Sequence, residues 1–388
     1  MNIKNKNILF KFTLLSLIFI SGGVQVFSIA FSTLIPTLLL IILYIKNKIF
    51  KIHGAIIPVM FFSFIYLLYA VIIANDMEDI QFVFFRSVRF IMAILLLNFI
   101  YLKKINFIDE LHSVLYWITI HGLINFVVVI LFFQYLTKIP ETNTYSFLLF
   151  FGTENLGHLF SRSQGIFWEP GVLQVYLNIF LFINLFLAKK VNIRLVTIIL
   201  ISVFLTLSTT GIVVSFLLIF YYYIISIKFK LKNILLAILF LPLIIGLLNL
   251  AINQAEEKIS GEKSGSFLAR NYDTLTGFNL AINNPWGIGF STIKYQEVAR
   301  KDLFNLMPGL ETDRANTNSI ATLFYSTGIL WGFIILYFMY KQSLFIKHKT
   351  LFYVSMFLFL FTEPLLYTPI FILILLSGTV SSKKQLRC

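Results

Sequence analysis

Cysteine and charge are both scarce in this chain of 388 residues. Its single cysteine is the last residue, Cys388, and only 12% of the residues are charged. One cysteine cannot form a disulfide framework or a set of thiolate metal ligands within the chain. The five histidines are scattered, and no spacing of His, Asp and Glu indicates a zinc site. We therefore expect neither a metal nor another cofactor.

Acidic residues are the scarcer charge, with 17 Asp and Glu against 31 Lys and Arg. A net charge of +14 would suit a nucleic-acid-binding protein. The basic residues, however, lie in short groups at the ends of apolar runs, and 59% of the chain is hydrophobic. This is the positive-inside pattern of a membrane protein, so nucleic acid is not an expected partner.

Long hydrophobic runs predict an all-α fold, a polytopic bundle of membrane helices. Backbone polar groups inside a bilayer must be paired internally, so such runs form helices. If every basic group is cytoplasmic, an even number of crossings separates neighbouring groups. These groups fall at residues 1–11, 46–51, 103–104, 189–194, 228–232, 341–349 and 383–387.

The segment lengths then predict about twelve spans, with both termini in the cytoplasm and residues 1–388 forming a single transmembrane domain. Stretches long enough for one span are 54–74, 82–102, 111–136, 166–188, 234–253 and 318–340. Three longer segments each predict two short spans that turn at a central break. The breaks are Gly22-Gly23 in 12–45, Ser208-Thr209-Thr210-Gly211 in 195–227, and Glu363-Pro364 in 351–380.

Two segments on the outer side are predicted loops, 137–164 and 254–315. The second is longer than a connection requires, and loops of that length are usually functional or disordered. Its aromatic residues favour a small folded cap over disorder. They are Tyr272, Phe278, Trp286, Phe290 and Tyr295.

Two arginines lie inside an apolar span. Arg86 and Arg89 fall near the outer end of the fourth span, three residues apart and so on one helical face. Arginine at the bilayer midplane costs about 2.5–3.5 kcal/mol on insertion scales. Either the pair reaches the external headgroups or the acidic turn of residues 76–79, or it presents two guanidinium groups to a lipid-linked phosphate or pyrophosphate.

The densest candidate site is the stretch from Ser161 to Gly171, where the first outer loop re-enters the membrane. It brings Arg162, Trp168 and Glu169 to the interface. A carboxylate beside an aromatic ring at that depth is partly desolvated, which suits it to general acid or base catalysis. The alternative is that Glu169 serves only as the N-cap of the helix that follows, or as a first-turn charge that interacts with its dipole.

The large outer loop holds further arginines beside turn signals. Arg270 precedes an Asn-Asn-Pro-Trp-Gly-Ile-Gly segment at 283–289, and Arg314 lies near the end of the loop. Both arginines either contact a ligand or form salt bridges within the loop. The Gly-x-Gly alone is a weak indication of phosphate binding, because no predicted strand precedes it.

In their order along the chain, four motifs resemble those of the Wzy-type O-antigen and capsular polysaccharide polymerases, within the O-antigen ligase-like superfamily. The motifs are residues 162–171, residues 205–211, Arg270 with 284–289, and Asn318-Ser319 leading to 328–332. Ligases of the superfamily usually carry a His just before that Asn. Thr317 stands there in this chain, which favours a polymerase. Many relatives also have a basic residue after the Ser of the second motif, where this chain has Thr209-Thr210.

The resemblance implies a metal-independent membrane glycosyltransferase, similar to GT-C type enzymes, in the bacterial inner membrane. The loops 137–164 and 254–315 would then be periplasmic. The enzyme would transfer a growing glycan from undecaprenyl pyrophosphate onto a new lipid-linked repeat unit. Its expected partners are the undecaprenyl-pyrophosphate-linked oligosaccharide and membrane lipid, and a chain-length regulator protein is a further candidate.

Site roles follow from the resemblance and from the misplaced charges. Arg162 and Arg270 are predicted to stabilise the departing pyrophosphate, and Glu169 to accept the proton of the acceptor hydroxyl. The predicted substrate-binding residues are Arg86, Arg89, Trp168, Arg314 and Asn318. The alternative functions are an O-antigen ligase or, from another class, a flippase or transporter of lipid-linked oligosaccharide. Transporters usually show internal repeats, and none is visible here.

Overall fold

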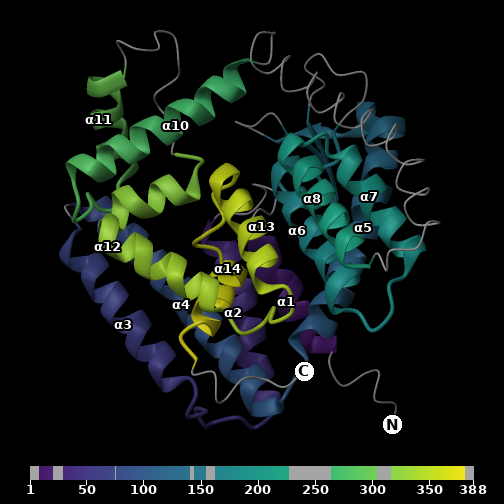
Figure 1. The fold of residues 1–388 in the computed structure, drawn as a ribbon, viewed down its shortest axis with the longest axis horizontal. Coiled ribbons are helices and arrows are strands. Elements are labelled where there is room, and N and C mark those ends of the chain that lie inside the picture. The colour runs from purple at the N-terminus through teal and green to yellow at the C-terminus, as the bar shows by residue number, and fades with distance from the viewer. Residues whose placement is uncertain are drawn as a thin grey trace. The chain divides into compact units, whose positions relative to one another are not determined.

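The computed structural model describes residues 8–20, 29–74, 76–139, 144–153, 162–226, 264–303 and 316–380. Contacts divide the chain into two compact units, and Figure 1 labels their helices. Unit 1 comprises Met1–Ile118, Ile166–Trp168 and Tyr272–Cys388, and unit 2 comprises Thr119–Gly165 and Glu169–Asn271. The expectation of one transmembrane domain with two outer loops stays a prediction.

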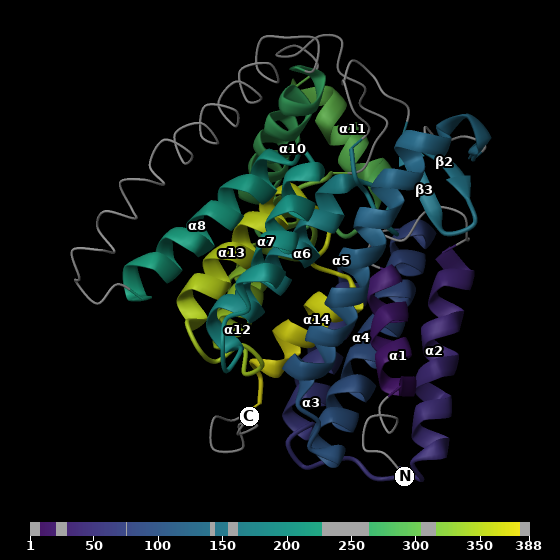
Figure 2. The same ribbon diagram turned by 90° about the vertical axis from the view of Figure 1, so that its right-hand side faces the viewer.

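Unit 1 is built around a short helix that is buried on every side. This helix is α14 (Pro369–Ser377), and all nine of its residues are buried. It packs against α4 (Met77–Lys103), α12 (Ser319–Lys341) and α1 (Ile8–Ile20). Helices α1, α2 (Ile29–Lys46) and α4 run side by side in Figure 2. The remaining helices of unit 1 are α3 (Ile57–Ile72), α11 (Thr292–Leu303), α13 (Lys349–Thr362), the first part of α5 (Phe107–Phe132) and the second part of α10 (Ser264–Asn283).

Unit 2 has the same plan around α6. Every residue of α6 (Pro170–Phe182) is buried, and the helix continues as a π-helical turn, η3 (Ile183–Leu187). Helices α7 (Ile193–Leu205) and α8 (Thr209–Ser226) pack against α6 and against each other. A helix that is buried all round needs apolar residues on all faces, so polar side chains on α6 require an explanation.

The segment that was predicted to be the first outer loop contains a small sheet, which the all-α prediction did not include. Three antiparallel strands, β1 (Thr137–Lys138), β2 (Thr144–Phe147) and β3 (Phe150–Thr153), follow a 3-10 turn, η2 (Phe133–Tyr135). Aromatic residues and threonines favour strands here. Asn125 of α5 holds β3, because its amide donates to the carbonyl of Phe151 (2.9 Å) and accepts from the Phe151 N–H (2.7 Å).

Five described helices are long and apolar enough to cross a membrane. They are Met77–Lys103, Phe107–Tyr135, Pro170–Leu187, Thr209–Ser226 and Ser319–Lys341, and five shorter apolar helices accompany them. The all-α, multi-pass membrane class is thus confirmed, while the count of twelve spans stays a prediction. The helices change at two of the three predicted breaks, between Leu205 and Thr209 and between Thr362 and Pro369. The Gly22-Gly23 break and the predicted span 234–253 lie outside the described residues.

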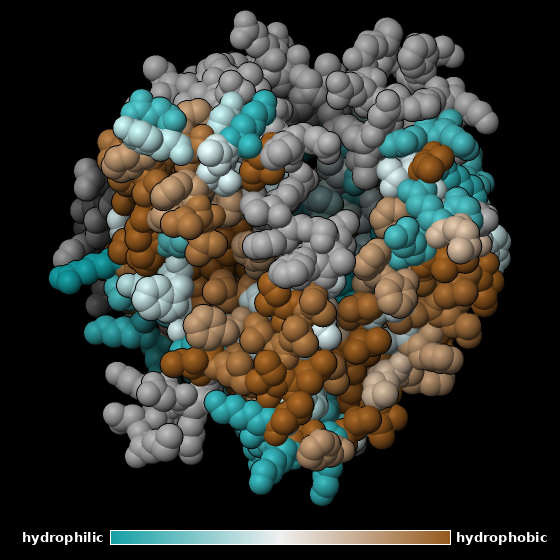
Figure 3. All heavy atoms as spheres, turned by 180° about the vertical axis from the view of Figure 1, so that it is seen from behind, coloured by the Kyte–Doolittle hydropathy of each residue, from teal (hydrophilic) through white to brown (hydrophobic). Residues whose placement is uncertain are grey.

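Exposed apolar residues indicate where lipid contacts the helices. On α3, Phe61, Phe64, Leu68 and Ile72 are exposed at helical spacing, whereas the opposite face is buried. Hydrophobic side chains cover much of the face seen in Figure 3, and hydrophilic residues lie mainly toward its edges. Such an apolar exterior is expected of a protein whose solvent is lipid.

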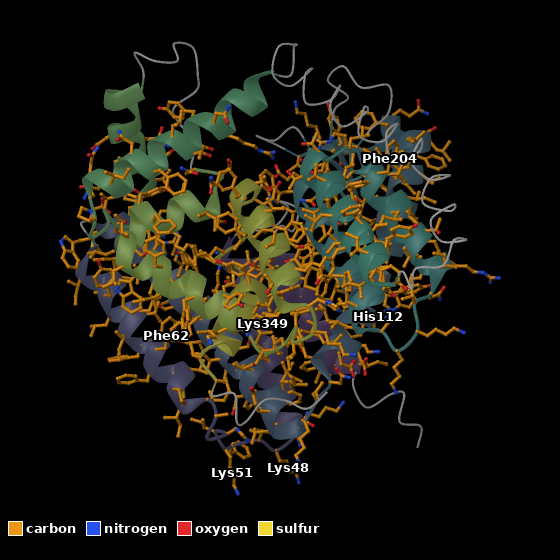
Figure 4. All side chains as sticks on the ribbon, in the orientation of Figure 1. Lys48, Lys51, Phe62, His112, Phe204 and Lys349 are labelled. Atoms are coloured by element: carbon orange, nitrogen blue, oxygen red, sulfur yellow. The ribbon has the colours of Figure 1, made fainter. Side chains whose placement is uncertain are left out.

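Two of the basic groups lie together in unit 1, as the positive-inside pattern requires. The ammonium group of Lys103 donates to the carbonyl of Asn47 over 3.4 Å. Lys48 and Lys51 are exposed and point away from the same end of the ribbon (Figure 4). A shared basic end supports the predicted topology, and its cytoplasmic orientation stays a prediction.

Candidate functional site

The first turn of α4 contributes three acidic residues to the site in unit 1. Asp76 is the N-cap, and its carboxylate accepts the backbone N–H of Asp79 over 2.7 Å. Glu78 and Asp79 follow in the first turn, where negative charge is stabilised by the helix dipole. Asp79 is fully buried, so its carboxylate must be engaged by other parts of the protein.

The segment 284–291, between α10 and α11, crosses a break in α12. Helix α12 is interrupted at Gly328, whose φ of 84° and ψ of 164° are not helical. The break frees backbone groups that pair with the segment. Ile288 donates to the carbonyl of Tyr325 (2.9 Å), and Ile329 donates to the carbonyl of Pro285 (2.9 Å). Two sequence motifs that are far apart in the chain thus form one backbone crossing.

Glycine is required on both sides of this crossing. Gly287 has φ of 89°, and a Cβ there would lie 2.6 Å from the carbonyl oxygen of Ser326. A Cβ on Gly328 would lie 2.6 Å from the carbonyl oxygen of Pro285. Both positions therefore need positive φ and the closest possible backbone approach, which only glycine permits.

The Gly-x-Gly segment is structural and does not offer a phosphate cradle. Its successive backbone N–H groups all donate within the protein. The N–H of Gly287 donates to the carbonyl of Asn284, that of Ile288 to the carbonyl of Tyr325, and that of Gly289 to the carbonyl of Ser326. The N–H of Phe290 donates to the carboxylate of Asp79. A phosphate loop instead presents its N–H groups to the ligand.

Asp79 fastens this segment to α4. Its Oδ1 accepts the backbone N–H of Phe290 over 2.6 Å, and a Cβ on Gly289 would lie 2.5 Å from its Oδ2. The neighbouring Glu78 accepts the hydroxyl of Ser291 over 2.8 Å. The acidic turn thus binds backbone and hydroxyl groups of the segment after α10.

The guanidinium group of Arg86 contacts two aromatic rings, whose planes lie at 82° to each other. Its central carbon is 3.4 Å from the ring centroid of Phe290 and 4.3 Å from that of Tyr367. Such cation–π contacts are worth about 0.5–2 kcal/mol each, more when desolvated. The Nη1 of Arg86 is buried and has no hydrogen-bond partner within the part of the chain that the structure describes.

Arg89, one turn further along α4, faces the same tyrosine. Its Nη1 donates to the carbonyl of Tyr367 over 3.3 Å, while its buried Nε has no partner among the described residues. The Tyr367 hydroxyl in turn shares a hydrogen bond with Tyr66 (3.0 Å). The two predicted arginines therefore lie together in an aromatic environment, each with a donor that is buried and unused. Such donors favour an anionic oxygen as ligand.

In unit 2, two of the predicted motifs come together. The Nε of Arg162 donates to the carbonyl of Thr206 (3.0 Å), and the backbone of Ser163 donates to the carbonyl of Leu205 (2.9 Å). Residues 162–163 thus lie on the turn between α7 and α8. Glu169 occupies the N-cap position of α6, but its side chain makes no cap hydrogen bond.

The other predicted residues have different surroundings. Trp168, in unit 1, and Arg270, on α10, are both partly exposed. Asn318 caps α12, because its Oδ1 accepts the backbone N–H groups of Ile320 and Ala321, and its Nδ2 donates to Thr274. Asn318 therefore has a structural part, and its contact with substrate stays a prediction. Arg314 lies outside the described residues.

A buried carboxylate that the sequence did not single out organises the start of α12. Asp273 of α10 accepts the hydroxyl of Thr317 (2.7 Å), its backbone N–H (3.1 Å) and the hydroxyl of Tyr295 (3.3 Å). Burial raises the pKa of the Tyr295 hydroxyl above its ordinary value, and the charge of Asp273 raises it further. Nothing in the sequence distinguishes Asp273 from the other acids of the polar loop.

Metal-binding side chains are not grouped in the described part of the chain. Within those residues, no three His, Cys, Asp or Glu side chains lie close enough to hold a metal ion. The site in unit 1 is instead made of guanidinium groups and aromatic rings.

A family model described as O-antigen ligase (Wzy_C) matches residues 195–337. The match supports the O-antigen ligase-like superfamily. It runs from the start of α7 into α12, so it includes the α7–α8 turn and the crossing of Gly287 with Gly328. No match was found among curated proteins or solved structures.

Members of this family are membrane enzymes of the glycosyltransferase or ligase type that act on lipid-linked polysaccharide. The match and the apolar helices together support a multi-pass membrane protein of polysaccharide biosynthesis. A polymerase and a ligase share this family, so the match does not distinguish them.

Proposed function

We propose that the protein is a polysaccharide polymerase of the inner membrane. It transfers a growing glycan from undecaprenyl pyrophosphate onto a new lipid-linked repeat unit at the periplasmic face. The observation that carries this proposal is the pair Arg86 and Arg89, buried on a membrane helix with unused N–H donors. Within an O-antigen ligase-like protein, a lipid-linked pyrophosphate is the anion that best explains such a pair.

The chemistry requires stabilisation of a leaving group. The bond between the anomeric carbon of the donor glycan and the pyrophosphate oxygen breaks, and a bond to the acceptor hydroxyl oxygen forms. Negative charge then develops on the pyrophosphate, and charge-assisted hydrogen bonds to it contribute about 1.5–3 kcal/mol each. Donors that are fixed beforehand stabilise that charge without reorganisation. The rings of Phe290 and Tyr367 fix Arg86 in this way.

Further roles are proposed from the sequence motifs. Arg162 and Arg270 stabilise the departing pyrophosphate, and Glu169 accepts the proton of the acceptor hydroxyl. The carboxylate of Glu169 makes no cap hydrogen bond to α6, which supports a role other than capping. Trp168, Arg314 and Asn318 are proposed substrate contacts, and the loops 137–164 and 254–315 are proposed to be periplasmic.

The second candidate is an O-antigen ligase, which the description of the matching family model favours. Against it stands Thr317, whose hydroxyl is bound to the buried Asp273 where ligases carry a histidine. A chain-length regulator protein remains a proposed partner of the polymerase. A flippase is the candidate from another class.

Glycan analysis of a strain that lacks the gene separates these functions. Loss of a polymerase leaves single repeat units on the cell surface, loss of a ligase leaves polymer on its lipid carrier, and loss of a flippase traps units inside. We expect the first result, with long chains restored by the wild-type gene and not by Arg86→Gln/Arg89→Gln. Arg194→Gln is the control, since Arg194 is exposed at the start of α7. Long chains in the deletion strain would refute the proposal.

A further inference from the structure

Helix α6 carries two carboxamides in an otherwise apolar and fully buried helix. Gln174 is 0% and Asn178 is 1% exposed, and they lie one turn apart on the same face. A third carboxamide, Gln164, is 0% exposed and precedes the helix. Polar residues within membrane spans are rare and usually functional.

Gln174 and Asn178 lie directly against the start of α8. The Nδ2 of Asn178 donates to the carbonyl of Gly211 (3.1 Å) and to the Oε1 of Gln174 (3.2 Å). A Cβ on Gly211 would lie 2.8 Å from the Cβ of Gln174, so only glycine allows this approach. The side chains of Gln174 and Asn178 therefore lie against Gly211, at the end of the turn that joins α7 to α8.

Gln164 belongs to the same neighbourhood. The residue before it, Ser163, donates its backbone N–H to the carbonyl of Leu205, at the other end of that turn. A Cβ on the residue after it, Gly165, would lie 3.5 Å from the side chain of Leu173, the neighbour of Gln174. All of these residues belong to unit 2.

Four polar atoms of the three carboxamides have no partner among the described residues. They are the Nε2 and Oε1 of Gln164, the Nε2 of Gln174 and the Oδ1 of Asn178. Buried polar atoms are normally hydrogen-bonded, and leaving them unpaired is strongly unfavourable. The set contains two N–H donors and two carbonyl acceptors, with no charge.

We propose that Gln164, Gln174 and Asn178 form a subsite for the hydroxyl groups of a neutral saccharide. A hydroxyl both donates and accepts, so it can satisfy an amide donor and an amide acceptor together. An anion would satisfy only the donors, and a cation only the acceptors. This subsite rests on the proposed function, in which a glycan is the neutral part of the substrate. Bound water has the same hydrogen-bonding chemistry and is the alternative source.

The subsite is closed in this structure, since all three side chains are covered. The segment that carries Gln164 is tied to the turn between α7 and α8 by the hydrogen bonds of Arg162 to Thr206 and of Ser163 to Leu205. Because the three side chains are 0–1% exposed, a saccharide can reach them only when a neighbouring segment moves.

Apolar replacement of the amides distinguishes saccharide from water. The test uses purified full-length Gln174→Met/Asn178→Leu, with lipid-linked repeat units extracted from the deletion strain as substrate. The bond between Gln174 and Asn178 loses both of its members, which is nearly neutral for folding, but the carbonyl of Gly211 loses its Asn178 donor, so we expect a small decrease in the melting temperature. We expect KM for the repeat unit to rise about tenfold, as for one lost hydrogen bond. An unchanged KM would mean that the amides hold only water or each other, and would overturn the subsite.

Asn184→Leu is the matched control. Asn184 is also a buried amide on the same span, and its Nδ2 donates to the carbonyl of Phe180 over 2.9 Å. This replacement should lower the melting temperature and leave KM unchanged. A rise in KM equal to that of the double variant would show that any buried amide on this span has the same effect, and would overturn the subsite.

A second measurement uses the unchanged protein, in case the double variant does not fold. Hydrogen exchange of residues 162–178 is followed while oligosaccharide released from the lipid-linked repeat unit is added. Slower exchange in this segment supports the subsite, and unchanged exchange at saturating oligosaccharide overturns it. If the three amides do not bind a saccharide, the wild-type protein still forms polymer. Failure of the proposed function, by contrast, appears as long glycan chains in the deletion strain.

Discussion

The backbone N–H of Phe290 donates to the Oδ1 of Asp79 over 2.6 Å, although the two residues are 211 positions apart in the chain. This bond ties the segment between α10 and α11 to the first turn of α4. It also sets the ring of Phe290 on the guanidinium group of Arg86. One buried carboxylate therefore connects this segment to the arginines of the candidate site.

Asp79→Ala should destabilise the protein by about 1.5–3 kcal/mol, the range for hydrogen bonds to charged groups. The reason is that the N–H of Phe290 loses its acceptor in a buried place. The thermal midpoint in detergent measures the effect. Asp109→Ala, an exposed acid in the first turn of α5, is the control and should change it little. Equal thermal midpoints for the two variants would show that the bond between Asp79 and Phe290 does not stabilise the protein.

Gly287→Ala should be destabilising by more than about 1 kcal/mol, because alanine strains a positive φ and its Cβ meets the carbonyl of Ser326. Gly122→Ala is the control, since its Cβ would meet only ordinary contacts at 3.6 Å or more. Thermal midpoints of the two variants give the comparison. Equal midpoints for the two variants would show that the segment at Gly287 does not approach the backbone of α12 as closely as the 2.6 Å contact requires.

Arg86→Lys should lower kcat/KM for lipid-linked repeat units about tenfold or more, with little change in the amount of folded protein. Lysine keeps the charge but cannot stack a planar head group on the rings of Phe290 and Tyr367 or present a planar fork to a phosphate. Arg194→Lys, on the exposed start of α7, should retain wild-type kinetics. Unchanged kinetics for Arg86→Lys would remove Arg86 from substrate binding.

Tyr295→Phe should alter the dependence of stability on pH. The raised pKa of Tyr295 means that the folded state holds this proton more tightly than the unfolded state does. Its stabilising contribution is therefore complete below the ordinary tyrosine pKa of about 10 and declines as the pH rises above it. The variant, which loses the bonds to Asp273 and Asn316, should be less stable at pH 8. The difference in stability between wild type and Tyr295→Phe should be smaller at pH 11 than at pH 8.

Melting curves of wild type and Tyr295→Phe between pH 8 and pH 11 check this prediction. Tyr135→Phe is the control, because Tyr135 is 65% exposed and should give a constant difference. A gap between wild type and Tyr295→Phe that stays constant or widens with pH would contradict the assignment.

Local sequence signals predicted the helices and several of their ends. The helix break between α7 and α8 was expected from a Ser-Thr-Thr-Gly turn, and the break before α14 from Glu363-Pro364. The placement of Arg86 and Arg89 on one face followed from helical spacing alone. These features depend on neighbouring residues, so the sequence contains them directly.

Contacts between distant segments were not predictable in the same way. The turn signal at Pro285-Trp286-Gly287 was recognised, but its pairing with the break at Gly328 depends on tertiary packing. The predicted cap also included Trp286, which is 71% exposed, whereas Asp273 and Gln174 were not singled out. A buried polar side chain is recognised only when its surroundings are known.

Polymer synthesis by the purified protein is the direct test of the proposed polymerase function. The wild type is incubated with lipid-linked repeat units extracted from the deletion strain, with no other protein, and the products are separated by size. We expect a ladder of multiples of the repeat unit with release of undecaprenyl pyrophosphate, and no ladder from Arg86→Gln/Arg89→Gln. Single units that persist with the wild type, or a ladder of equal intensity from the double variant, would contradict the proposed function.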